Sequence, residues 1–359
     1  MVQRTISVDI TDKLTESQVN DIRRTADMCK QIFTIFRDIC IEHRSTAYFS
    51  LHKFGYFTAK DACPDLPSSI LQSAAKLACS CVKSFNSNNA DNKWQYSGDL
   101  KSCSYSLDAT TLSKRGDLYS FSTCNKRIRV MIPMQQWFSD KYQIEKLQAG
   151  KIIYKKGRVK LQLVFIVSNN DNCGDRVVGI DRGIYNLVAT SDGYLYSATE
   201  IRAAKRQFQH NRKTLQQKGT RSAKRRLKQM SGREKRFMQS VNHQVTKQLA
   251  ADKSVAVYAI EDLKGIRKQR YGKKLNKWLS NWSYFQFETF LEYKCELNGI
   301  QVVKVDPRYT SQKCSVCGSI NKQSRNGNHY KCCICGHSEH ADINAAKNIR
   351  KNYLLSLER

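Results

Sequence analysis

The chain has 359 residues and a formal net charge of +30, because it contains 61 Lys and Arg but only 31 Asp and Glu. This length indicates at least two domains, and so large a basic surplus favours nucleic acid as a partner over a merely solvated surface or an anionic membrane. No apolar run approaches the roughly 18 residues of a membrane span, and the first residues lack the apolar stretch of a secretory signal, so we expect a cytoplasmic protein with no membrane partner.

The N-terminal half combines one isolated strand, a helical region and a group of later strands. Residues 3–10 alternate apolar and polar side chains as a strand does. Apolar residues at three- and four-residue spacing predict a helix from about Thr15 to Glu42, and a second helical pattern covers 69–85. Further strands, expected to form a small β-barrel or sheet with residues 3–10, are predicted at 118–123, 127–133, 142–148, 151–156 and 159–168.

A second domain is predicted after the polar stretch 168–175, which we interpret as a linker. Its first part, 176–198, contains two apolar strands, with Ser191, Asp192 and Gly193 at a hairpin tip. A long helical stretch follows, then a buried strand at 254–261, a helix around 283–298 and a strand at 300–306. Strands and helices in this order favour an α/β fold, in which helices cover both faces of a mixed sheet.

Three acids stand where these predicted elements end or begin. Asp181 closes the strand VVGI, Glu261 closes VAVYAI, and Asp342 opens the helical pattern DINAAKNIRKNY. Carboxylates at the carboxyl ends of neighbouring strands project into one crevice, and an acid at a helix start adds a third. They repel one another unless cations lie between them, and hard oxygen ligands suit two Mg²⁺ or Mn²⁺ ions that hydrolyse a phosphodiester. The sequence therefore predicts a metal-dependent nuclease.

Each of these acids also has a purely structural interpretation. A strand-terminal Asp is commonly a turn former or a helix cap, and Asp342 fits an ordinary N-cap. Three further acids compete with them. Asp192 fits the hairpin turn, Asp306 precedes Pro307 in a strand exit, and Asp262 would point away from its neighbour on the strand. The nuclease hypothesis depends on the combination of three acids.

Four cysteines form two CxxC pairs that are separated by 14 residues and each followed by glycine: Cys314, Cys317, Cys332 and Cys335. The pattern is typical of a four-cysteine zinc site. Four thiolates complete a tetrahedron, so we expect one structural Zn²⁺ with no position for a catalytic water. Cys333 is interpreted as a spare thiol, and His329, His337 and His340 are less favoured ligands. The remaining cysteines are expected to be reduced and mostly buried.

Basic residues concentrate in two segments of the second domain. Between 201 and 240, 14 Lys or Arg accompany a single acid, Glu234, on a helical pattern. A helical pair of this kind is expected to contact phosphates, through Arg225, Arg226, Arg233 and Arg236. A basic loop directly after the strand at 254–261 is expected to guide a strand or to act as a lid, through Lys264, Arg267 and Lys268. The alternative for both segments is an exposed, solvated surface.

The motifs GIDRG, IEDL, DPRYTSQKCSVCG and HADINAAKNI, in this order, closely resemble the C-terminal half of the TnpB proteins of insertion sequences, which are relatives of type V CRISPR effectors. The resemblance covers about 176–352 by motif, and the N-terminal half only by length and order of elements. It implies an RNase H-like (RuvC-like) nuclease domain whose triad falls on Asp181, Glu261 and Asp342. It also implies a zinc ribbon on the two CxxC pairs, and an N-terminal wedge-like β-barrel interrupted by a helical recognition lobe.

This resemblance also implies the domain boundaries. The barrel would take 1–12 and 99–172, with the recognition lobe at 13–98 between them. The nuclease domain would take 173–310, including the basic helical segment 200–250, and would resume at 339–359 after the zinc ribbon at 311–338.

By the same resemblance, the protein is expected to be an RNA-guided, Mg-dependent DNA endonuclease of a transposable element. A transposon-derived guide RNA pairs with one strand of the target double-stranded DNA, the protein reads a short adjacent motif, and one site cuts both strands. We expect a prokaryotic protein, associated with the nucleoid when bound to DNA. A monomer on the RNA is expected, since one chain carries every motif of one active site.

Three other interpretations stay open. A nuclease-inactive, RNA-guided repressor of the same fold would bind DNA without cutting, but it would be expected to lose acids of the triad. A transposase that joins strands also uses three acids on an RNase H-like fold, although the zinc ribbon between the second and third acids argues against it. In a plain zinc-ribbon nucleic-acid binder, Asp181 and Glu261 would be structural.

Overall fold

The computed structural model describes residues 2–100, 103–169, 171–183, 185–263 and 284–358. The chain divides into two compact units, Met1–Ser168 and Asn169–Arg359. The division falls at the start of the polar stretch 168–175. Within the described residues, no helix is both long enough and apolar enough to cross a membrane.

Three helices form one part of the first unit: α1 (Glu16–Glu42), α2 (Tyr48–Ala62) and α3 (Ser68–Asn88). A capping box in which Thr15 and Gln18 exchange hydrogen bonds starts α1. The apolar stripe of α1, with Phe33 and Phe36 fully buried, packs against α3. Helices α1 and α3 confirm the sequence prediction, whereas α2 was not predicted.

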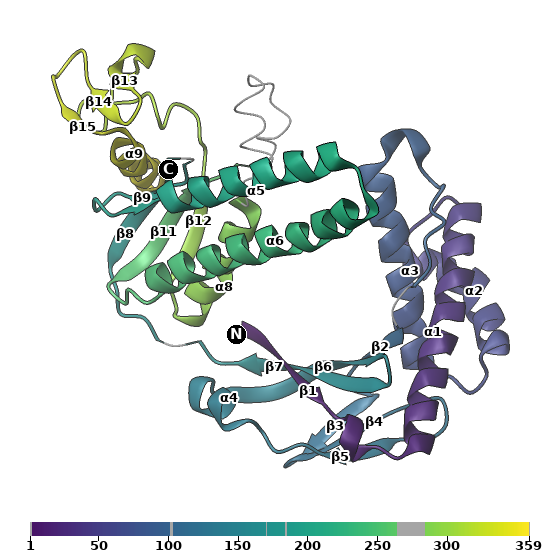
Figure 1. Ribbon diagram of the computed structural model, residues 1–359. Helices are drawn as coiled ribbons and strands as arrows, with labels where there is room; N and C mark the ends of the chain where they lie inside the picture. The colour runs from purple at the N-terminus through teal and green to yellow at the C-terminus, as the bar shows by residue number, and fades with distance from the viewer. Residues whose placement is uncertain (1, 101–102, 170, 184, 264–283, 359) are drawn as a thin grey trace. The chain divides into compact units, whose positions relative to one another are not determined.

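The strands of the first unit form two antiparallel sheets (Figure 1). The larger sheet has the order β1-β7-β6-β2, with β1 at Val2–Asp9, β2 at Cys103–Leu107, β6 at Ile144–Lys155 and β7 at Arg158–Val167. The smaller sheet has the order β3-β4-β5, with β3 at Leu112–Arg115, β4 at Leu118–Phe121 and β5 at Ile128–Met131. A short helix, α4 (Gln136–Lys141), precedes β6.

The pairing of β1 with β7 confirms that the isolated N-terminal strand joins the later strands, with the three helices inserted between them. Two details differ from the sequence prediction. The segments 142–148 and 151–156 belong to the single strand β6, which absorbs two register shifts near Lys146 and Ala149. The strands β2 and β3 were missed: β3 is short and mostly polar, and β2 alternates apolar and polar residues over only five positions.

The second unit contains a five-stranded mixed sheet of order β10-β9-β8-β11-β12. Its strands are β8 (Arg176–Asp181), β9 (Asn186–Thr190), β10 (Leu195–Ser197), β11 (Val255–Glu261) and β12 (Gln301–Val305). Strands β8, β11 and β12 run parallel, while β9 and β10 form an antiparallel hairpin beside β8. The segment 176–198 thus forms three strands where two were predicted, and the predicted hairpin tip at Gly193 joins β9 to β10.

Helices cover both faces of this sheet, as the sequence predicted. On one face, α5 (Thr199–Lys218), α6 (Arg221–Ala250) and α8 (Tyr284–Leu297) surround a core that includes Ile180, Tyr258 and Leu291. On the other face, α9 (Ala341–Leu357) packs through Ile349 against Ala259. Between β12 and α9 lies a small sheet of order β13-β14-β15, with strands at Arg325–Asn326, His329–Lys331 and Ser338–His340.

Candidate metal sites and nucleic-acid surface

Asp181 and Glu261 are the last residues of the parallel neighbours β8 and β11. The register pairs Ile180 with Ile260, and both isoleucines belong to the core beneath α6 and α8. Because side chains alternate along a strand, the two acids that follow point to the opposite face, on which α9 packs. Asp342 is the second residue of α9. The structure thus gathers the three acids at one end of the same sheet face.

Gly179 explains why α9 can approach the sheet so closely. A Cβ atom at this position would lie 2.0 Å from the carbonyl oxygen of Ala346 and 2.7 Å from the backbone nitrogen of Arg350. Only glycine allows the backbone of α9 to cross β8 at this distance. The same crossing brings the first turn of α9, which carries Asp342, to the strand end that carries Asp181.

Side chains from distant segments hold the carboxylates, and sequence reasoning missed all of them. Asn186 Nδ2 donates to Asp342 Oδ2 at 2.9 Å, and Arg325 Nη2 donates to Asp342 Oδ1 at 2.7 Å. Thr310 Oγ1 donates to Glu261 Oε1 at 2.5 Å. No short motif signals these partners, because β9, the 306–313 loop and β13 reach the acids only through the tertiary fold.

The acids form one electrostatic unit. Removal from water, together with the charges of Glu261 and Asp342, raises the pKa of Asp181 well above its usual value. Removal from water also raises the pKa of Glu261, although the hydrogen bond from Thr310 acts in the opposite direction. A carboxylate such as Asp181, whose ionisation is opposed by burial and by two neighbouring carboxylates, gains from a bound cation, and an all-oxygen donor set is the one that hard divalent ions prefer.

The competing acids have other partners. Asp192 pairs with Arg176, and Asp306 pairs with Arg308. The N-cap interpretation of Asp342 is wrong, because the cap of α9 is His340, whose Nδ1 accepts from the backbone nitrogen of Asp342 at 3.2 Å. The carboxylate of Asp342 is therefore available to face the other acids.

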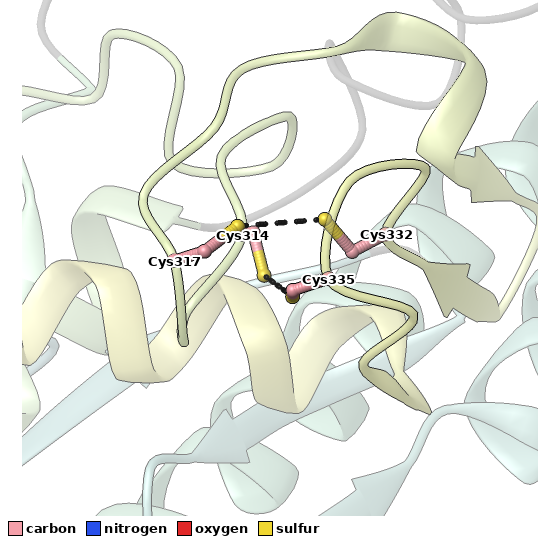
Figure 2. A group of neighbouring side chains, drawn as sticks. All are labelled: Cys314, Cys317, Cys332 and Cys335. Atoms are coloured by element: carbon pink, nitrogen blue, oxygen red, sulfur yellow. Dashed lines mark hydrogen bonds between the residues drawn. The ribbon is translucent and has the colours of Figure 1, made fainter.

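The four predicted cysteines converge on one point (Figure 2). Their sulfur atoms all lie within 4.8 Å of one another, with 3.7 Å between Cys314 and Cys335 and 3.6 Å between Cys317 and Cys332. A regular tetrahedron with Zn–S bonds of about 2.3 Å has edges of about 3.8 Å, so the arrangement fits one zinc ion. Hydrogen bonding, first of all from Ser319, lowers the pKa of Cys332 to about 5, which favours the thiolate that a metal requires.

Glycine makes both cysteine turns possible. The backbone nitrogens of Gly318 and Gly336 donate to the carbonyls of Cys314 and Cys332 at 3.0 and 3.1 Å. Their φ angles of 76° and 73° lie in the left-handed region, which glycine adopts without a steric penalty. Each CxxC pair is thus folded into a tight turn that aims two sulfurs at the same side.

The less favoured ligands lie outside this group. Cys333 is exposed, with its sulfur 3.4 Å from the Ser324 hydroxyl, and His337 pairs with Glu339 at 2.7 Å. Most of the other cysteines are buried free thiols, as predicted, although Cys173 is exposed.

Two buried asparagines of α9 connect the cysteine turns with the acids. Asn344 accepts from the Ser315 backbone nitrogen at 2.8 Å and donates to the Lys313 carbonyl at 2.8 Å. Asn348 donates to the carbonyls of Thr310 and Lys313 at 2.9 and 2.6 Å. The segment from Thr310, which contacts Glu261, to the first cysteine turn is therefore fixed on the helix that carries Asp342.

The basic segment forms a helical hairpin of α5 and α6 (Figure 1). Gly219 turns the chain with a φ of 63°, and the Thr220 hydroxyl caps α6 by accepting from the Ala223 nitrogen. The four predicted phosphate-contacting residues are all exposed on α6: Arg225, Arg226, Arg233 and Arg236. Arg226 and Arg233 line a hollow of about 550 Å³ between the two helices. The other predicted contacts, Lys264, Arg267 and Lys268, lie outside the described residues.

Two family models match the second unit and the strand before it. One, described as "Probable transposase", matches residues 162–265 and so covers Asp181 and Glu261. The other, described as "Cas12f1-like, TNB domain", matches residues 284–349 and covers the four cysteines and Asp342. The two matches together contain every residue of both candidate metal sites.

Several known proteins are similar in sequence to the chain. The CRISPR-associated endodeoxyribonuclease Cas12f1 of Sulfoacidibacillus thermotolerans is 29% identical over 60% of this chain and 55% of that protein. The putative RNA-guided DNA endonuclease InsQ of Escherichia coli is 28% identical over 54% of this chain and 53% of that protein. A TnpB-like protein of Methanocaldococcus jannaschii is 26% identical over 62% of this chain and 84% of that protein. The chain thus spans about half the length of the Cas12f1 and InsQ relatives.

A solved structure extends the similarity to the N-terminal unit. A chain in the cryo-EM structure of a Cas12f1-sgRNA-target DNA complex matches 94% of this chain and 83% of its own length, with a TM-score of 0.64 and 17% identity. The fold is therefore that of this effector class. The two family models, together with the similarity to InsQ and to the TnpB-like protein, show that the chain belongs to the TnpB family.

Proposed function

We propose that the protein is an RNA-guided endonuclease of a transposable element that cuts double-stranded DNA next to a short motif. The observation that carries the proposal is the meeting of three acids from β8, β11 and α9 on one sheet face, with the partners described above. A purely structural role for Asp181 does not explain why this carboxyl group is buried near two other carboxylates, which raises its pKa and makes its charged form less favourable.

In this proposal, Asp181, Glu261 and Asp342 hold two Mg²⁺ or Mn²⁺ ions in an RNase H-like (RuvC-like) domain. Bound ions of this kind supply an activated water and stabilise the leaving oxygen of a phosphodiester. The surrounding side chains position the ligands: Thr310 orients Glu261, and Asn186 orients Asp342. Arg325 offsets part of the negative charge of the acids.

Cys314, Cys317, Cys332 and Cys335 would hold one structural Zn²⁺, as a zinc ribbon. The ribbon would act on the reaction indirectly. It fixes the loop that carries Thr310, and it delivers Arg325 from β13 to Asp342. Because four thiolates fill a tetrahedral shell, this site leaves no position for a substrate.

The proposed nucleic-acid contacts follow from charge and exposure. The exposed arginines of α6 would contact phosphates, and the net charge of +30 suits a protein that binds both a guide RNA and its target DNA. In RNA-guided systems, base pairing carries the sequence specificity while the protein grips the heteroduplex backbone. The sheets and inserted helices of the first unit would be the wedge-like barrel and the recognition lobe, and one chain carries one full set of acids, which is sufficient for a monomer.

The test begins with protein purified from cells that carry the native locus. Any RNA that copurifies is sequenced, and the complex is assayed with Mg²⁺ on a plasmid library that bears the matching target. We expect a discrete RNA and cuts beside one short motif, and loss of cutting in Asp181→Asn. Asp192→Asn is the matched control, because that carboxylate is paired with Arg176 at a hairpin turn.

Other outcomes separate the alternatives. Target binding without cutting by the wild-type protein would identify a repressor, and strand joining would identify a transposase. Absence of a specific RNA would contradict the proposal and leave a basic nucleic-acid-binding protein.

A further inference from the structure

Tyr309 is a surface tyrosine in an unfavourable backbone conformation. Its φ angle is 61°, in the left-handed region that non-glycine residues seldom adopt, yet its side chain is 56% exposed. A residue that only filled a turn here would be better as Gly or Asn. Strain of this kind persists where the surroundings fix it and is concentrated at functional sites.

Several hydrogen bonds hold the strained turn in place. The backbone nitrogens of Gln312 and Lys313 donate to the Tyr309 carbonyl at 3.0 and 2.9 Å. The single hydroxyl proton of the next residue, Thr310, is shared between Glu261 Oε1 at 2.5 Å and Pro307 O at 3.0 Å. The conformation that exposes the Tyr309 ring is therefore the conformation that places Thr310 on a proposed metal ligand.

The ring lines a groove of about 590 Å³ at the end of β12. The groove is also lined by Lys304, Arg308 and Lys313, by one acid, Asp306, and by Asn352 and Leu355 of α9. The Arg308 side chain is 80% exposed, although it pairs with Asp306. An exposed aromatic ring in the same groove as cationic side chains is the combination that binds single-stranded nucleic acid, because the ring stacks on a base and the cations contact phosphates.

We propose that Tyr309 stacks on an unpaired base of the DNA strand that enters the acid site, with Arg308 and Lys313 on the neighbouring phosphates. This inference rests on the proposed function, since it assigns a binding residue to that site. Consecutive Cα atoms are about 3.8 Å apart, and Thr310 touches Glu261, so the stacked base belongs to a nucleotide within a few positions of the cut. Only an unpaired base offers its face, so the residue favours a single strand over a duplex.

The experiment compares Tyr309→Phe and Tyr309→Asn in the RNA-loaded protein. Phenylalanine keeps the ring, whereas asparagine removes it and tolerates the left-handed backbone, so the turn should survive. Single-turnover cleavage is measured with RNA-loaded protein in excess over the DNA but at a concentration that does not saturate binding, so that the rate reports on binding as well as on cutting. A lost base stack is worth roughly 1–3 kcal/mol, so Tyr309→Asn should cut about 5-fold to 150-fold more slowly, while Tyr309→Phe stays close to the wild type.

A second readout distinguishes stacking from a structural role. Target strands carrying one abasic position are tested in turn near the cut. At one abasic position, the cutting rate of the wild type should fall to the rate of Tyr309→Asn on the intact strand. The same abasic position should not lower the rate of the Tyr309→Asn variant further, because both changes remove the same contact. Tyr194→Asn is the matched control, since Tyr194 is also exposed, at 68%, but lies on the β9–β10 hairpin.

The outcomes are separable from those of the proposed function. A wild-type protein that cuts no DNA contradicts the endonuclease itself. If the wild-type protein cuts DNA, two results would contradict the stacking role alone. One is a Tyr309→Asn variant that cuts as fast as the wild type, and the other is a Tyr309→Phe variant that cuts as slowly as Tyr309→Asn. An abasic position whose effect adds fully to that of Tyr309→Asn contradicts it as well.

Discussion

Arg325 donates from Nη2 to Oδ1 of Asp342 at 2.7 Å, so the cysteine-bearing segment reaches directly to one of the three acids. The carboxylate of Asp342 is almost fully buried, and the positive charge of Arg325 offsets part of the rise that burial causes in the pKa of Asp181 and Glu261. The positive charge of Arg325 therefore compensates part of the negative charge of all three acids, as a bound metal ion would. This relationship connects the two candidate metal sites.

Replacing Arg325 should change metal binding in a defined direction. Without the guanidinium, the acids repel one another more strongly and gain more from a divalent ion. For a partly exposed pair worth about 1 kcal/mol, Arg325→Ala should bind Mn²⁺ about fivefold more tightly than the wild type in calorimetric titration. Lys331→Ala, which removes an exposed charge from β14, should leave the affinity unchanged. Weaker binding in Arg325→Ala would mean that the arginine chiefly orients Asp342.

Loss of the proposed zinc should impair the acid site without any change to the acids. Cys332→Ser opens the four-sulfur group, so the loop that carries Thr310 keeps only its hydrogen bonds to α9, and the strand that carries Arg325 is held less firmly. We expect one zinc per chain in the wild type, none in Cys332→Ser, and weaker Mn²⁺ binding in that variant. Cys333→Ser, an exposed neighbour outside the group, should keep both metals. Zinc retained in Cys332→Ser, as measured by elemental analysis, would contradict the assignment.

Gly179 should tolerate no side chain. The added methyl group of Gly179→Ala meets the α9 backbone, so the helix must move away from β8, at a cost of about 3 kcal/mol in the free energy of unfolding. Gly232→Ala is the matched control in the middle of α6, where the methyl group meets only the flexible end of Arg236. It should stabilise the protein by about 0.5–1 kcal/mol. Urea unfolding measures both, and equal midpoints for the two variants would contradict the close crossing.

Asp108 should make stability depend on pH in the acid range. Burial alone would raise the pKa of this carboxyl, but hydrogen bonds from Ser69, Thr110 and Thr111 lower it well below the usual value. A depressed folded-state pKa gives stability that is fully present above about pH 4 and is lost as the pH falls further.

Asp108→Ala should therefore cost about 2 kcal/mol in the free energy of unfolding at pH 6, and the difference from the wild type should shrink between pH 4 and pH 2. Asp99→Ala, which removes an exposed carboxylate beside Arg37, should cost less than about 1 kcal/mol. A difference for Asp108→Ala that stays constant with pH would show that the carboxylate charge has no part in it.

Local patterns in the sequence were enough to predict the elements that bear the acids and cysteines. Strand β11 is a continuous apolar run that ends at Glu261, and the CxxC spacing needs no tertiary information. Helix α2 was missed because its apolar residues do not follow one stripe: Phe49 and Phe57 are exposed while Leu51 is buried. Periodicity predicts a helix only where one face is consistently apolar.

The partners of the acids could not be predicted, since each depends on contacts between segments far apart in the chain. Thr310 lies 49 residues after Glu261, and Asn186 lies 156 residues before Asp342. Arg325 had no feature that separated it from the other basic residues. The close crossing at Gly179 was equally hidden, because a glycine in a strand is compatible with several roles.

The most direct test of the account is the cutting rate of Asp181→Asn at an unchanged affinity for DNA. The amide keeps the shape of the side chain but cannot carry the charge that a divalent ion needs. With RNA-loaded protein on a matched target in Mg²⁺, we predict DNA binding within about twofold of the wild type and a single-turnover rate at least about 10³-fold lower. Cutting by Asp181→Asn at the wild-type rate would contradict the proposal that these three acids are the nuclease site.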